Sequence, residues 1–111
     1  MSKIYFTLTG TNYFHGNDFL KPGMKLKLKK QRDNEYDKEA IVVKMEGLGE
    51  IGHVANSTRT VIGDSMSAGR LYDKIGEKAK ANVVLVTQHG TICRLSKKSL
   101  IGNKDVKLEK E

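Results

Sequence analysis

The feature that most constrains the fold of this chain is an alternation of apolar and lysine side chains that follows a Pro22-Gly23 turn. In residues 24–29, methionine or leucine occupies every even position and lysine every odd position. A period of two places successive side chains on opposite faces of a β-strand, whereas a helix would mix both kinds around its circumference. The pattern therefore predicts a strand with one face in a core and one lysine-lined face in water.

Similar short apolar runs recur along the chain and are separated by turn residues. They occupy residues 4–8, 41–45, 51–54, 81–86 and 91–95. The turns Gly47-Leu48-Gly49 and His89-Gly90 are typical of connections between antiparallel strands. With residues 24–29, these runs predict six strands in a mostly antiparallel sheet that curls or closes into a barrel.

One stretch between the fourth and fifth strands has helical spacing instead. A helix is predicted to begin at Asn56 or Ser57 and to carry apolar residues through Met66. A second short helix is predicted around residues 71–75, ending at Gly76. The expected fold class is thus mostly β: a small six-stranded OB-like or SH3-like barrel with a short two-helix insertion after the fourth strand.

The length of 111 residues predicts a single domain, assigned here to residues 1–102, with a charged tail at residues 103–111. The N-terminus leads directly into a strand pattern rather than a signal peptide, and no run approaches 18 apolar residues. The single cysteine, Cys93, excludes a disulfide within the chain. These features predict a cytoplasmic, reduced protein that does not enter a membrane.

The charge is strongly positive. Twenty Lys and Arg against thirteen Asp and Glu give a formal net charge of +7. Six basic residues lie between Lys21 and Arg32, and no acidic residue interrupts them. Small basic domains often bind phosphate groups, so nucleic acid is a candidate partner, although solubility alone also explains many basic surfaces.

Sequence signatures of catalysis are sparse. There is no GxxxxGK(S/T) phosphate loop, so we expect no ATPase activity and no nucleotide cofactor. His89 and Cys93 lie at a spacing that could suit a metal, but we expect a turn residue and a buried strand residue there, with no cofactor or metal. One enzymatic alternative remains open, in which Asp33, Asp37 and Glu39 hold a divalent ion for phosphodiester hydrolysis.

Two loops combine aromatic, amide and charged side chains. Residues 12–15 read Asn-Tyr-Phe-His, and residues 32–37 read Arg-Asp-Asn-Glu-Tyr-Asp. Aromatic rings stack on bases and cations hold phosphates, which is the chemistry of a single-stranded nucleic acid site. The alternative is structural: Tyr13 and Tyr36 would cap the core, and Asp33-Asn34 would be ordinary turn residues.

These loops resemble the HIRAN domain family, named for its place at the N-terminus of fork-remodelling helicases. The resemblance lies in residues 8–16 (Leu-Thr-Gly-Thr-Asn-Tyr-Phe-His-Gly), 32–41 (Arg-Asp-Asn-Glu-Tyr-Asp-Lys-Glu-Ala-Ile) and 51–54 (Ile-Gly-His-Val). With the strands between, it extends from Ile4 to about Leu95. It implies a modified OB-like barrel that captures the 3′ end of single-stranded DNA.

By the same resemblance, Tyr13 and Tyr36 would contact the terminal bases and Asn34 would hydrogen-bond to the nucleotide. Asp37 would accept from the terminal 3′ hydroxyl, and His53 would shape the pocket or reach a phosphate. The complete set of expected nucleic-acid-binding residues is Asn12, Tyr13, Arg32, Asp33, Asn34, Tyr36, Asp37 and His53.

The sequence departs from the helicase members at two basic positions. An arginine of those members is replaced by Asn12, and a lysine near Asn56 is missing. Weaker end binding is therefore expected, unless lysines of residues 25–29 or Arg32 compensate. The family's contact to the nucleic acid from the hairpin between the last two predicted strands would fall near residues 87–90.

The function expected from the sequence is a non-enzymatic module of DNA repair that captures single-stranded DNA at a free 3′ hydroxyl, with RNA as a second possible ligand. A helicase or nuclease would act as its partner in trans. Two alternatives stay open: the metal-dependent hydrolase above, and a protein-interaction barrel whose residues 83–86 form an exposed edge.

Overall fold

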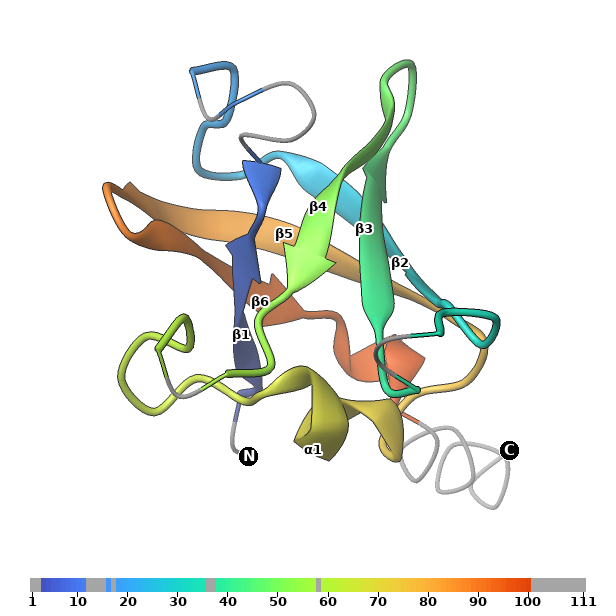
Figure 1. The fold of residues 1–111 in the computed structure, drawn as a ribbon. Coiled ribbons are helices and arrows are strands. Elements are labelled where there is room, and N and C mark those ends of the chain that lie inside the picture. The colour runs from blue at the N-terminus through green and yellow to red at the C-terminus, as the bar shows by residue number, and fades with distance from the viewer. Residues whose placement is uncertain (1–2, 12–15, 17, 36–37, 58, 101–111) are drawn as a thin grey trace.

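The structure, a computed structural model, is a closed six-stranded antiparallel barrel with strand order β1-β4-β3-β2-β5-β6 (Figure 1). It describes residues 3–11, 16, 18–35, 38–57 and 59–100. The strands are β1 (Tyr5–Thr9), β2 (Lys25–Lys30), β3 (Ile41–Met45), β4 (Gly49–Val54), β5 (Lys78–Thr87) and β6 (Gly90–Leu95). The prediction of six strands in a mostly antiparallel barrel is confirmed.

Strand β2 lies between β3 and β5 and has the two-faced character that its sequence predicts. Leu26 and Leu28 are each 1% exposed, while Lys25, Lys27 and Lys29 are exposed. The leucines join a core that all six strands supply. Its most deeply buried members include Phe6, Leu8, Ile41, Val43, Ile51, Leu71 and Ile75. Burial of this apolar surface is the main driving force of the fold.

Gly52 allows β1 and β4 to approach closely. A β-carbon at this position would lie 2.6 Å from the carbonyl oxygen of Thr9 and 2.7 Å from Cδ1 of Leu8. No side chain fits at such distances, so the glycine of the Ile-Gly-His-Val stretch has a packing role. It brings Thr9 opposite His53 in the register of the two strands.

The predicted helix beginning at Asn56 or Ser57 is wrong, because the described residues between β4 and β5 form a single short α-helix that begins at Ala68. Residues 56–57 and 59–67 instead form turns and bends, part of which lies against β1. The amide of Ile62 donates to the hydroxyl of Thr7 at 3.0 Å, and the amide of Met66 donates to the carbonyl of Tyr5 at 2.7 Å. Gly63 has a φ of +55°, which lies outside the right-handed helical region.

Helix α1 (Ala68–Tyr72) corresponds to the second predicted helix, but it begins and ends earlier than expected. Ser67 is its N-cap, and Asp73 rather than Gly76 is its C-cap. Asn56 does cap a helix, although not the one predicted for it: its Oδ1 accepts from the amide of Gly69 at 2.8 Å. The first turn of α1 therefore has one acceptor from its own N-cap and a second from a residue that is distant along the chain.

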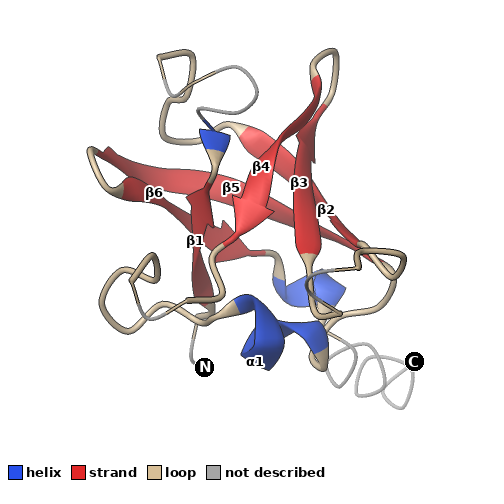
Figure 2. Ribbon diagram, viewed as in Figure 1, coloured by secondary structure: helices blue, strands red, loops and turns tan. Residues whose placement is uncertain are grey.

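Helix α1 and the 3-10 helix η2 (Lys97–Ser99) lie at the same end of the barrel (Figure 2). Leu71 of α1 is fully buried in the core, and Ile75 forms an isolated bridge with Leu100 after η2. Among the described residues, no helix is long and apolar enough to cross a bilayer. The predicted tail, residues 103–111, lies outside the described residues.

Leu71→Ala should test whether α1 is an integral part of the core. Removing a fully buried leucine leaves a cavity, so we expect the free energy of unfolding to fall by about 2–5 kcal/mol. Urea unfolding followed by circular dichroism measures this loss. Leu85→Ala is the matched control, since Leu85 is 54% exposed and should change stability by less than about 0.5 kcal/mol. Equal losses in both variants would contradict the assignment.

Cys93 provides a second test of the core. It is fully buried on β6, and burial raises the pKa of its thiol to about 12. Because the thiolate is the reactive form, native protein at about pH 8 should not react with Ellman's reagent, whereas protein in guanidinium should react fully. The raised pKa also means that the unfolded state loses this proton first, so the thiol lowers stability as pH rises from about 9 towards 12. Rapid labelling of native protein would contradict the burial.

Candidate nucleic-acid interface

A row of directly paired residues crosses the barrel from β1 to β5, through Val42, which is only 2% exposed. Thr9 of β1 pairs with His53 of β4, which pairs with Val42 of β3. Val42 pairs with Lys29 of β2, and Lys29 with Lys78 of β5. Directly paired residues in an antiparallel sheet point to the same face. The imidazole of His53 and two lysines therefore belong to one face.

Gln31 joins His53 to the loop between β2 and β3. Its Oε1 lies 3.0 Å from Nε2 of His53 and 3.2 Å from Nδ2 of Asn34. An amide oxygen accepts but cannot donate, so the proton of the first contact resides on Nε2 of His53. The backbone amide of Asn34 also donates to the backbone carbonyl of Gln31 at 3.2 Å. Gln31 thus holds the imidazole of His53 and the side-chain amide of Asn34 beside each other.

The start of the same loop is held by Glu77 through one ion pair and one backbone hydrogen bond. The guanidinium of Arg32 donates to Glu77, and the amide of Lys30 donates to the carbonyl of Glu77 at 3.0 Å. The hydrogen bond and the charge of Glu77 both raise the pKa of Arg32, so Arg32 stays a cation. The ammonium of Lys30 lies 4.3 Å from the ring centroid of Tyr72, a cation–π contact.

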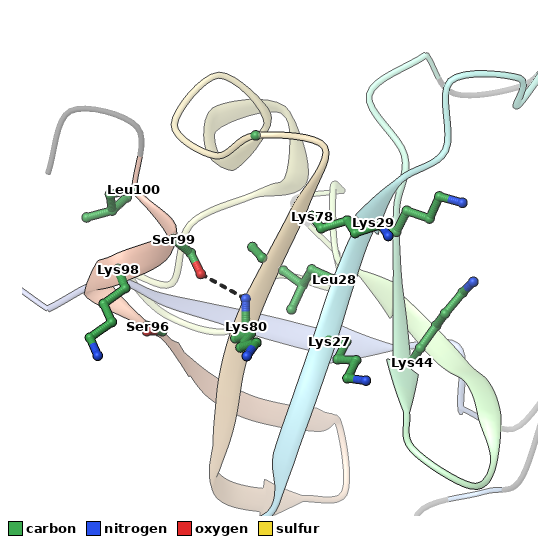
Figure 3. Close-up of a pocket in the computed structure, with 12 residues that line it drawn as sticks. Lys27, Leu28, Lys29, Lys44, Lys78, Lys80, Ser96, Lys98, Ser99 and Leu100 are labelled. Atoms are coloured by element: carbon green, nitrogen blue, oxygen red, sulfur yellow. Dashed lines mark hydrogen bonds between the residues drawn. The ribbon is translucent and has the colours of Figure 1, made fainter. Parts of the chain in front are cut away.

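A groove of about 660 Å³ lies on the outer face of β3, β2 and β5, with η2 at its side (Figure 3). Six of its lining residues are lysines, and we therefore call it the lysine groove. They are Lys27, Lys29, Lys44, Lys78, Lys80 and Lys98. Among the described residues that line the groove there is no aspartate or glutamate. The lysine-lined face that residues 24–29 predict is therefore part of a wider basic surface.

The expected binding residues have different outcomes. Asn34 and His53 are brought together through Gln31, whereas Arg32 is engaged by Glu77 and Asp33 is exposed. Four others lie outside the described residues: Asn12, Tyr13, Tyr36 and Asp37. The late hairpin is formed by β5 and β6, and His89 in its turn is exposed.

Several residues of this surface were not anticipated from the sequence. Gln31 stands at the end of β2, where no motif marks it. Lys78 and Lys80 alternate with Ala79 and Ala81, so the same period that identified β2 was present in β5. What the sequence does not contain is the register that places Lys78 opposite Lys29 and Lys80 opposite Lys27.

Metal ligation finds little support in the described part of the chain. No group of three or more His, Cys, Asp or Glu side chains there could hold a metal ion. Cys93 lies in the core while His89 is exposed in the turn between β5 and β6. Asp37 lies outside the described residues, so the hydrolase alternative stays a prediction.

Comparison with protein-family models identifies a HIRAN domain over residues 1–71. The chain belongs to the HIRAN domain family. The matched part of this HIRAN domain contains the strands β1 to β4 and most of α1. No curated protein matches the sequence.

Two solved structures have the same fold as this HIRAN domain. The crystal structure of the HIRAN domain of human HLTF matches with a TM-score of 0.59 and 17% identity, over 95% of this chain and 82% of that chain. The crystal structure of a protein from Lactobacillus plantarum matches with a TM-score of 0.52 and 19% identity, over 86% of this chain and 97% of that chain. Both matches extend past residue 71, so the shared fold includes strands beyond the family match.

Gln31→Ala should test the contact that holds His53. Without the Gln31 oxygen, the Nε2–H of His53 loses its acceptor, so we expect this proton to exchange faster with water and stability to fall by about 0.5–1.5 kcal/mol. Urea unfolding measures the stability, and proton and nitrogen-15 spectra of the imidazole follow the Nε2–H. Gln31→Glu is the matched control because a carboxylate still accepts from Nε2. Unchanged stability and unchanged exchange in Gln31→Ala would contradict the contact.

Proposed function

We propose that this HIRAN domain is a binding module that captures single-stranded DNA at a free 3′ hydroxyl. The observation that supports it best is the convergence of the three family-like stretches on His53. The stretch of residues 8–16 includes Thr9, which pairs with His53. The stretch of residues 32–41 includes Asn34, whose side chain donates to the same Gln31 oxygen as His53. The family is itself associated with DNA binding.

The chemistry of the described residues suits a nucleotide end. The Asn34 amide offers a donor and an acceptor to a sugar or a base edge. It is kept beside the imidazole of His53 by a shared acceptor, so a ligand would meet the two groups already positioned. Preorganisation of this kind lowers the entropic cost of binding.

The remaining contacts are proposed from the family resemblance. Tyr13 and Tyr36 stack on the terminal bases, and Asp37 accepts a hydrogen bond from the 3′ hydroxyl. A 3′ phosphate would remove that donor and bring negative charge towards the carboxylate. The domain acts without catalysis, and a helicase or nuclease is its partner in trans.

The protein-interaction alternative has one observation in its favour. Val84 and Leu85 are 40% and 54% exposed on β5. The pairing of β5 with β2 ends at Asn82, so this part of β5 continues beyond β2 while still pairing with β6. An apolar partner strand could lie there, and such a function predicts no affinity for nucleic acid.

Fluorescence anisotropy with a short labelled single strand tests the proposal. We expect tighter binding to an oligonucleotide with a 3′ hydroxyl than to the same oligonucleotide with a 3′ phosphate. Asp37→Ala should abolish this preference while affinity for the phosphorylated end stays nearly unchanged. Tyr36→Ala should weaken both ends by about 1–3 kcal/mol, because stacking does not depend on the terminal group.

The controls separate end capture from its alternatives. Asp64→Ala alters an exposed carboxylate of the turn before α1 and should leave the hydroxyl preference intact. Equal affinity for both ends in the wild-type protein would overturn end capture. Cleavage of the labelled strand in magnesium or manganese would favour the hydrolase alternative, and an absence of binding would favour the protein-interaction alternative.

A further inference from the structure

The lysine groove has an arrangement that scattered surface charge would not produce. In the register of the sheet, Lys27 lies opposite Lys80 on one side and opposite Lys44 on the other, while Lys29 lies opposite Lys78. Like charges directly opposite each other in a sheet destabilise it. Solubility would be served equally well by lysines in positions that do not repel each other. The alignment therefore has a cost in stability, which a bound anion would remove.

The acidic residues near this surface offset only a part of that charge. Glu46 lies 3.7 Å from the ammonium of Lys27, and both side chains are well exposed. Glu50 lies opposite Lys44 at the hairpin between β3 and β4. Exposed ion pairs of this kind contribute little free energy, and ions in solution compete with them easily.

The groove is also a recess rather than a plane. The η2 segment forms one side of it through Ser96, Lys98 and Ser99 (Figure 3). The hydroxyl of Ser99 is fixed there, because it accepts from the amide of Lys80 at 2.9 Å. A recess lined by ammonium groups suits a single polyanionic chain that can enter it better than the flat surface of a membrane.

The groove and the site around His53 lie on one row of paired residues. Lys29 and Lys78 belong to the same row as His53, and buried Val42 separates Lys29 from His53. Three strand spacings separate His53 from Lys78, or about 14 Å. A strand whose end lies beside Asn34 and His53 would therefore reach the groove within a few nucleotides.

We propose that the lysine groove holds the sugar–phosphate backbone of single-stranded nucleic acid as it leaves the end site. This inference rests on the proposed function, since the end site sets where the strand starts. It assigns to β2, β3, β5 and η2 the phosphate contacts that Asn12 and the region of Asn56 do not supply. Phosphate contacts of this type position a strand without reading its sequence.

A triple variant, Lys27→Gln, Lys78→Gln and Lys80→Gln, tests the groove. The matched control is Lys3→Gln, Lys21→Gln and Lys74→Gln, which removes the same charge from exposed lysines outside the groove. Anisotropy is measured from about 50 to 200 mM salt with 3′-hydroxyl oligonucleotides of about 4 and about 16 nucleotides. Unfolding in urea is measured for each variant.

For the longer oligonucleotide, we expect the groove variant to lower the salt slope of the logarithm of affinity by about 2, since each single-strand phosphate contact contributes about 0.7. The preference for a 3′ hydroxyl with the shorter oligonucleotide should remain. The groove variant should also unfold at the same or a higher urea concentration than wild type, because like-charge repulsion has been removed. A loss of affinity without a loss of stability supports direct contact with phosphates.

Other outcomes separate this proposal from end capture. If the groove and control variants change the salt slope equally, the groove proposal is overturned while the hydroxyl preference can stand. If the wild-type protein shows no hydroxyl preference but only the groove variant lowers the slope, end capture fails and the phosphate track stands. Binding to vesicles rich in phosphatidylserine is measured as well. If the groove variant loses more affinity for these vesicles than for the oligonucleotide, nucleic acid is overturned as the occupant of the groove.

Discussion

The register of β2 is the constraint on which the rest of this structure depends. Leu26 and Leu28 must face the core, so the intervening lysines must face water. A slip of one residue would place those lysines in the barrel interior, at a cost that no other interaction here could offset. Because β2 pairs with both β3 and β5, its register also decides which of their lysines lie opposite its own.

The same sheet then carries two surfaces with different chemistry. Around His53, polar side chains are held by directed hydrogen bonds that His53 and Asn34 donate to the Gln31 oxygen, which suits the proposed recognition of one nucleotide end. Across β3, β2 and β5, the lysines supply positive charge with little direction, which suits a backbone of any sequence. Nucleic-acid-binding proteins commonly divide their work in this way between contacts that specify and contacts that position.

The strands could be predicted because their burial pattern is local in the sequence. The helix predicted at residues 56–66 is wrong, because tertiary contacts outweigh the apparent helical spacing there. The hydroxyl of Thr7 accepts from the amide of Ile62, and the carbonyl of Tyr5 accepts from the amide of Met66. Neither contact can be inferred from the local sequence. Asn56 shows the same limit: it was predicted to begin a helix at its own position, but its side chain accepts from Gly69 of α1, whose N-cap is Ser67.

The sequence by itself determined the six strands, the two-faced β2, the basic charge and the motif residues Asn34 and His53. The strands and the charge follow from side-chain chemistry and from a period of two along a strand, and the motif residues follow from the family resemblance. Only the tertiary structure decided that Gln31 joins Asn34 to His53, that Glu77 engages Arg32, and that six lysines from β2, β3, β5 and η2 form one groove. The physical reason is that these contacts depend on strand pairing and barrel closure, which bring together residues that are far apart in the chain.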